Sequence, residues 1–133
     1  MHLIAQNRYK FNISTKLQRY HLLDIHHLNK AHWFTLFGVS VGQVYCKSST
    51  FVHFDLHRFG QVNPVIITQT DEYTEVSIND SKLRFIIEDS ATDHHYLHVS
   101  LFSNYKSLRL LWPIIQVVFY LTVLEDAIYY DGK

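Results

Sequence analysis

The sequence predicts an α+β protein in which a curved antiparallel sheet packs on one long C-terminal helix. Segments with alternating apolar and polar residues recur between residues 51 and 101, which is the period of half-buried strands. Residues 108–130 instead form a long apolar segment with helical spacing. The chain has 133 residues, of which 47% are hydrophobic. We therefore expect a single domain, 1–133, with its own core.

The first forty residues change period once. Tyr9 to Leu17 alternates, which predicts a strand. From Gln18 the apolar residues recur at intervals of three and four, which predicts a helix. Glycines at 38 and 42 follow, so Val39 to Cys46 is either another strand or a loop across the core.

The middle of the chain reads as a series of strands. Phe51 to Arg58 alternates throughout, and Val62 to Thr68 contains Pro64, which favours an edge strand or a strand start. The clearest hairpin joins strands near 74–78 and 83–87 through the turn at 79–81. After a polar loop, a last strand places on one face His95, Leu97, Val99 and Leu101.

The C-terminal segment is expected to be a helix that lies on the sheet. Pro113 suits a first helical turn, and one stripe at helical spacing contains Leu110, Ile114, Val117, Leu121 and Leu124. The uninterrupted apolar part is shorter than the roughly 20 residues of a bilayer span, so we favour a buried helix. The space between helix and sheet is then a natural apolar pocket.

Composition narrows the functional classes. Twelve basic residues balance twelve acidic ones, which gives no electrostatic basis for binding nucleic acid or an anionic membrane. Cys46 is the only cysteine, so an intrachain disulfide is excluded and a reducing compartment fits best. Cys46 is expected to be a small core residue. The first ten residues do not resemble a targeting signal, and we expect a cytoplasmic protein.

The stretch that carries the most chemistry is 22–34, in which one carboxylate and three imidazoles fall within nine residues. Asp24, His27 and His32 follow the order Asp-x-x-His-x-x-x-x-His. Two neutral imidazoles and one carboxylate suit non-haem Fe(II). His32 lies about 140° from His27 on an ideal helix, so the helix must end or loosen near Lys30. A second carboxylate pair, at 125 and 126, stands near the C-terminus.

The motif Asp24, His27, His32 resembles the iron-binding motif in the catalytic domain of Rieske-type non-haem iron oxygenases. The segment 123–130 resembles the part of the C-terminal helix that carries the last ligand, especially in the steroid- and sterol-oxidising branch. The resemblance implies that His27, His32 and Asp126 ligate Fe(II). It also implies that Asp24 is the catalytic acid that receives electrons by hydrogen-bonding a ligand histidine. The family's fold is a helix-grip (START-like, SRPBCC) domain.

Three features of this chain depart from that family. His21 stands where the family usually has an Asn. The chain is short for such a catalytic domain, so the loops that cover the substrate must be reduced. A Rieske cluster needs two Cys and two His, and one cysteine cannot supply it. Any oxygenase activity therefore requires electrons from a separate protein.

Simpler interpretations remain open for the motif and for two other histidine clusters. Asp24 could cap or pair locally while the motif's histidines are half-buried. His53, Asp55 and His57 share one strand face and could bind Zn²⁺ or form a solvated face. The same two interpretations apply to His94 and His98, which share a face with each other.

Three functions follow from these observations. The first is a mononuclear non-haem Fe(II) oxygenase-like domain with an apolar, polycyclic-sized substrate and an electron-donor protein. The second is a helix-grip binding module that holds a hydrophobic ligand without redox chemistry. The third is a subunit of an assembly, including a homo-oligomer, in which aromatic surface pairs with another chain through Trp33, Phe34, Tyr129 and Tyr130.

Overall fold

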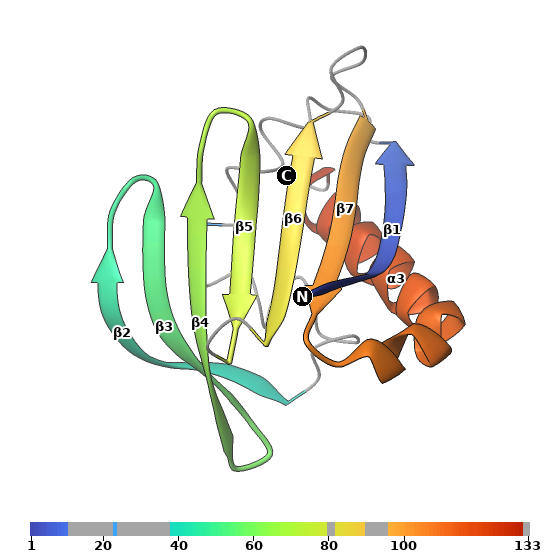
Figure 1. Ribbon diagram of the computed structural model, residues 1–133. Coiled ribbons are helices and arrows are strands. Elements are labelled where there is room, and N and C mark those ends of the chain that lie inside the picture. Colours follow the sequence, from blue (N-terminus) through green and yellow to red (C-terminus); the bar gives the residue numbers. More distant parts are fainter. Residues whose placement is uncertain (11–22, 24–37, 80–81, 90–95, 132–133) are drawn as a thin grey trace.

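The computed structural model describes residues 1–10, 23, 38–79, 82–89 and 96–131. In these residues, seven antiparallel strands form one curved sheet, and a long helix near the C-terminus lies against one of its faces (Figure 1). The α+β class and the antiparallel sheet with a C-terminal helix are therefore confirmed.

The order of strands across the sheet is β1-β7-β6-β5-β4-β3-β2. The strands are β1 (His2–Lys10), β2 (Val39–Lys47), β3 (Phe51–Arg58), β4 (Gln61–Gln69), β5 (Tyr73–Ile78), β6 (Leu83–Asp89) and β7 (Tyr96–Ser103). A 3-10 helix, η2 (Lys106–Leu111), leads directly into α3 (Trp112–Asp131). The order puts β1 and β2 at opposite edges of the sheet, so the chain between them, 11–37, has to pass from one edge to the other.

The first strand lies earlier than its expected position, because β1 ends at Lys10. Two features interrupt the alternation of apolar and polar residues in β1, so the sequence pattern does not indicate a strand there. The register with β7 shifts between Leu3 and Ala5, so adjacent Ile4 and Ala5 are both buried. Asn7 then places a polar side chain toward the helix, where its amide donates to Gln116 Oε1 at 2.8 Å. The expected strand and helix over 11–37 lie outside the described residues.

Most of the later strands are confirmed. β3 has the expected bounds, and its Val52 and Phe54 are almost fully buried. β2 forms where the sequence left a strand or a loop open. β5 and β6 form the expected hairpin, with Ile78 opposite Leu83. On β7, the expected apolar face is buried at Leu97, Val99 and Leu101. His95 lies outside the described residues.

Pro64 does not mark an edge strand, because β4 lies between β3 and β5. Its carbonyl accepts a hydrogen bond from the backbone N–H of Asn79, just past the end of β5. The N–H and C=O of one residue in an antiparallel strand point to the same neighbouring strand. The N–H that Pro64 lacks would therefore point toward β5, as its carbonyl does. Pairing of β4 with β5 begins only at Val65, so the ladder loses no hydrogen bond.

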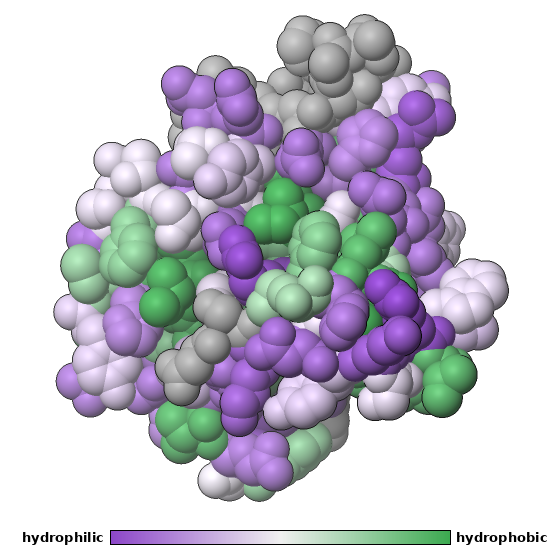
Figure 2. Space-filling model, in the orientation of Figure 1, coloured by the Kyte–Doolittle hydropathy of each residue, from purple (hydrophilic) through white to green (hydrophobic). Residues whose placement is uncertain are grey.

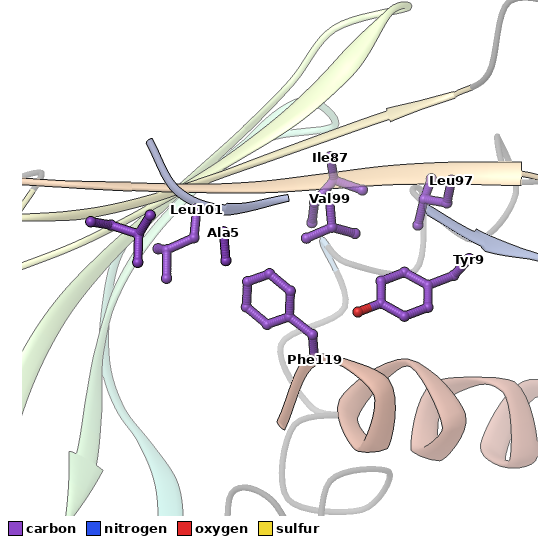
Figure 3. Packing of buried hydrophobic residues seen from close by; sticks show 8 residues of the cluster. Ala5, Tyr9, Ile87, Leu97, Val99, Leu101 and Phe119 are labelled. Atoms are coloured by element: carbon purple, nitrogen blue, oxygen red, sulfur yellow. The ribbon is translucent and has the colours of Figure 1, made fainter. Parts of the chain in front are cut away.

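The face of the sheet that contacts α3, here called the inner face, carries a continuous apolar surface. Residues directly opposite one another form one row across six strands: Val52, Ile67, Val76, Phe85, Leu101 and Ala5. The row joins a cluster on β3 and β4 to a second cluster on β1, β6 and β7. Figure 3 shows Phe119 of α3 pointing into the second cluster.

α3 presents a different side to the sheet from the one that its sequence suggests. The side chains that pack on the inner face are Phe119, which is buried, and Ile115. The predicted stripe lies on the opposite side of the helix, and Leu110, Ile114 and Val117 are 84%, 61% and 58% exposed. The helix therefore lies on the sheet as expected, but it is not buried on all sides, because this stripe is exposed. Helical spacing identifies such a stripe but does not select between two apolar sides of one helix.

Substitution of Phe54 by Ala should destabilise the fold severely. The side chain is 1% exposed, and removing a buried aromatic ring costs about 3–5 kcal/mol through lost burial and the cavity that remains. Phe59→Ala removes the same atoms at a site that is 72% exposed, and should cost less than about 1 kcal/mol. Urea unfolding followed by circular dichroism measures both. Equal losses would contradict the assigned core.

Candidate functional site

The predicted iron ligands fall mostly beyond the part of the chain that the structure describes. Asp24, His27 and His32 lie outside the described residues. Asp126 belongs to α3, but its side chain is also outside the described part. Among the described residues, no group of three His, Cys, Asp or Glu side chains could hold a metal ion. The ligand set therefore stays a prediction.

The residue next to Asp24 has a defined position. Leu23 is buried and belongs to the cluster formed by Val52 and Phe54 of β3 and by Val65 and Ile67 of β4. Those strand residues lie on the inner face, in register with the residues that contact α3. Leu23, which precedes the Asp-x-x-His motif in the sequence, is therefore buried on the same face of the sheet that carries the helix.

The rotation of α3 about its own axis is fixed at its contact with β1. Gln116 accepts from the side-chain amide of Asn7 and donates to the backbone carbonyl of Gln6 at 3.3 Å. Phe119 packs its ring at 5.7 Å from that of Phe85. The contacts of Gln116 and Phe119 therefore select the side of α3 that faces the sheet.

A polar group interrupts the apolar inner face at the end of β4. Gln69 is 6% exposed and lies opposite Thr74, which is fully buried. Within the described residues, Gln69 Oε1 has no hydrogen-bond partner. An unpaired buried amide oxygen typically costs about 1–3 kcal/mol. Sequence reasoning missed this residue, although the alternation Val65, Ile67, Gln69 places it inward.

Tyr9 is the titratable group of the helix-sheet contact. It is buried among apolar residues, and Figure 3 shows its hydroxyl directed into the space beside Phe119. Asn7 Nδ2 donates to this hydroxyl at 3.3 Å. Burial raises the pKa of the Tyr9 phenol above its ordinary value of 10.0, and the hydrogen bond from Asn7 lowers it by less.

The second predicted metal cluster does not form. Register places His53, Asp55 and His57 on the outer face, opposite the side chains of Val52 and Phe54. His53 and His57 are separated by roughly 13 Å along the strand, too far to share one ion. Asp55 instead accepts a hydrogen bond from the hydroxyl of Tyr45 at 2.6 Å. This hydrogen bond raises the pKa of the Tyr45 phenol. These residues therefore form a solvated strand face, the simpler of the two interpretations.

The rest of the outer face mixes polar with apolar side chains (Figure 2). Arg84 pairs with Glu75 at 2.6 Å, and the guanidinium of Arg8 lies 4.6 Å from the centre of the Tyr96 ring. His98 pairs in register with Arg8 on this face, while His94 lies outside the described residues. Cys46 is exposed on edge strand β2, so the expectation of a core cysteine is wrong.

Comparisons with known proteins leave the family of the chain open. No protein-family model matches the sequence. No curated protein matches it either. A solved structure described as "Crystal structure of the hypothetical protein from Sulfolobus tokodaii" is similar over 93% of this chain and 87% of that chain, with 11% identity and a TM-score of 0.45. Similarity at this level carries no argument about function.

Among the described residues, no helix combines the length and apolar character that crossing a bilayer requires.

Replacement of Gln69 by Met should leave the free energy of unfolding unchanged or raise it by about 1 kcal/mol. Methionine fills a similar volume and removes the buried oxygen that lacks a partner. The control is Ile67→Ala on the same strand, which should cost about 2–5 kcal/mol because it opens a cavity. Urea unfolding compares them, and a loss at Gln69→Met as large as at Ile67→Ala would show that the Gln69 amide is satisfied.

Tyr9 should make the protein less stable at alkaline pH. Because its pKa is raised in the folded state, the folded chain keeps a proton that the unfolded chain loses above pH 10.0. Below that pH, titration of Tyr9 should therefore not change the free energy of unfolding. As the pH rises through and beyond 10.0, the free energy of unfolding should fall. Urea unfolding at pH 8 and at about pH 11 measures the decrease.

Tyr9→Phe should reduce this decrease, whereas Tyr105→Phe, at a half-exposed position, should leave it as in the wild type. A wild-type decrease in the Tyr9→Phe variant would contradict the assignment.

Proposed function

We propose that the chain is a helix-grip domain that binds an apolar ligand between its sheet and α3. The order of strands supports this fold, because the first and last strands are neighbours and the connection 11–37 must cross from one edge of the sheet to the other. In the apolar row on the inner face, Val76 and Phe85 are only half-buried and give such a ligand a surface to contact.

We further propose that the domain holds Fe(II) through His27, His32 and Asp126 and acts as an oxygenase. One observation carries this proposal: both halves of the ligand set adjoin residues buried on the same face of the sheet. Leu23 precedes Asp24 and is buried on β3 and β4, while Phe119 precedes position 126 by about two helical turns and is buried on β1, β6 and β7.

The chemistry of the donor set fits the ion. Two neutral imidazoles and one carboxylate bind Fe(II) and leave coordination positions for O₂ and substrate. Bound there, the metal would supply the redox step that the chain's own side chains lack. Asp24 would accept a hydrogen bond from the free ring nitrogen of a ligand histidine and so fix its tautomer. The electrons come from a separate protein, since one cysteine cannot build a Rieske cluster.

The polar group on the inner face bears on the kind of ligand. Gln69 Oε1, for which the described residues supply no donor, can accept a hydrogen bond from a hydroxyl. A largely apolar molecule with a single hydroxyl, such as a sterol, would satisfy it and cover the surrounding Val, Ile and Phe side chains. This chemistry agrees with the steroid- and sterol-oxidising branch that the sequence resembles.

Iron binding tests the ligand assignment directly. After anaerobic reconstitution with Fe(II) and removal of free metal, the wild-type chain should retain about one iron per chain by elemental analysis. His27→Ala and Asp126→Ala should each lose it, because two remaining ligands bind Fe(II) weakly. His98→Ala is the control, since His98 lies on the outer face. Iron retained in the His27→Ala variant would rule out the assignment.

The second candidate function is a binding module without redox chemistry. Its support is the apolar inner face with Gln69 Oε1 as a single buried acceptor, because burial and one hydrogen bond can hold an apolar ligand without a metal. Thermal unfolding with and without cholesterol separates the two candidates. Stabilisation that needs neither Fe(II) nor His27 favours the binding module, and stabilisation that requires Fe(II) favours the oxygenase.

A further inference from the structure

The side of η2 and α3 that points away from the sheet carries a continuous apolar stripe. We call this stripe the α3 seam, and it consists of Leu110, Ile114, Val117, Leu121 and Leu124. Its spacing alternates between four and three residues, the pattern by which one helix packs along another. Leu121 is half-buried and the other four are 39–84% exposed, so the strands, η2 and α3 leave most of the seam uncovered.

The uncovered surface is large enough for a stable interface. Three further apolar side chains flank the seam and are 45–56% exposed: Leu111, Val118 and Tyr120. Seven exposed side chains of this size present roughly 700 Å² of apolar surface, close to the area that one partner buries in a standard protein interface. A patch of this extent exceeds that on most monomers.

We propose that the α3 seam pairs with the seam of a second copy of this chain, with the two helices antiparallel across a two-fold axis. The segment from Leu110 to Leu124 contains no charged residue, so apposing two copies buries no unpaired charge. A stripe with heptad spacing is also self-complementary, which is what an isologous interface requires.

Charges at the two ends of the seam select the antiparallel direction. Lys106 and Arg109 precede it and are exposed, whereas acidic residues follow it at 125 and 131. An antiparallel pair places the basic end of each helix beside the acidic end of its partner and also opposes the two helix dipoles. A parallel pair would bring like charges together. The acidic end also disfavours docking on an anionic membrane, for which basic flanks are typical.

The geometry predicts which positions meet. Val117 is midway between Leu110 and Leu124 along the seam, so in an antiparallel pair it lies at the two-fold axis. Each Val117 then faces its own counterpart, while Leu110 faces Leu124 of the other copy. This arrangement leaves the inner face of the sheet untouched, since the seam is on the opposite side of α3 from Phe119.

Sedimentation velocity should show a species of twice the chain's mass at about 100 μM, which dissociates on dilution. Val117→Glu should weaken the pairing more than about tenfold, because it buries a carboxylate at the axis. Val62→Glu is the matched control, since Val62 is 53% exposed on β4, and it should sediment as the wild type does. Circular dichroism confirms that both variants fold.

Disulfide trapping in a Cys46→Ser background tests the direction of the helices. Val117→Cys should cross-link to itself in air, and Leu110→Cys alone should not, whereas the double variant Leu110→Cys with Leu124→Cys should. Efficient self-cross-linking of Leu110→Cys would overturn the antiparallel arrangement. A monomer at about 100 μM would overturn the pairing itself. Binding of that monomer to phosphatidylcholine vesicles would show that the seam docks on a lipid surface instead.

Discussion

The antiparallel pairing of β1 with β7 is the constraint on which the rest of this fold depends. It joins the first described strand to the last, so residues about ninety positions apart in the sequence face one another. η2 and α3 follow directly from β7 and return along β1, where Arg109 donates to the carbonyl of Leu3. Without this pairing, neither Asn7 nor the carbonyl of Gln6 would be in place to hold Gln116.

The hydrogen bonds of Gln116 decide the orientation of an otherwise ambiguous helix. α3 is apolar on nearly every side, so burial alone would stabilise several rotations by similar amounts. The Asn7 and Gln6 contacts and the pocket for Phe119 favour one of them. That rotation directs the Phe119 side of α3 toward the sheet and the leucine- and valine-rich seam toward the outside. The proposed ligand site and the proposed interface are thus two consequences of a single choice.

Much of the sheet could be predicted from the sequence because its signals are local. Strict alternation marked β3, and the turn after Ile78 marked the hairpin of β5 and β6. Signals failed where one element depended on another. β1 was missed because a register shift and an inward Asn7 interrupt its alternation, and Pro64 was misassigned because β5 stops short of it.

The sequence by itself determined the α+β class and most strand positions, and it contains the histidine-rich motif and the carboxylate pair on which the proposed iron site is based. Periodicity follows from backbone geometry, which each segment carries alone. Only the tertiary structure decided which side of α3 meets the sheet, that His53, Asp55 and His57 face outward, and that Gln69 is buried without a partner in the described residues. These outcomes depend on contacts between distant segments, and such contacts leave no period in the sequence.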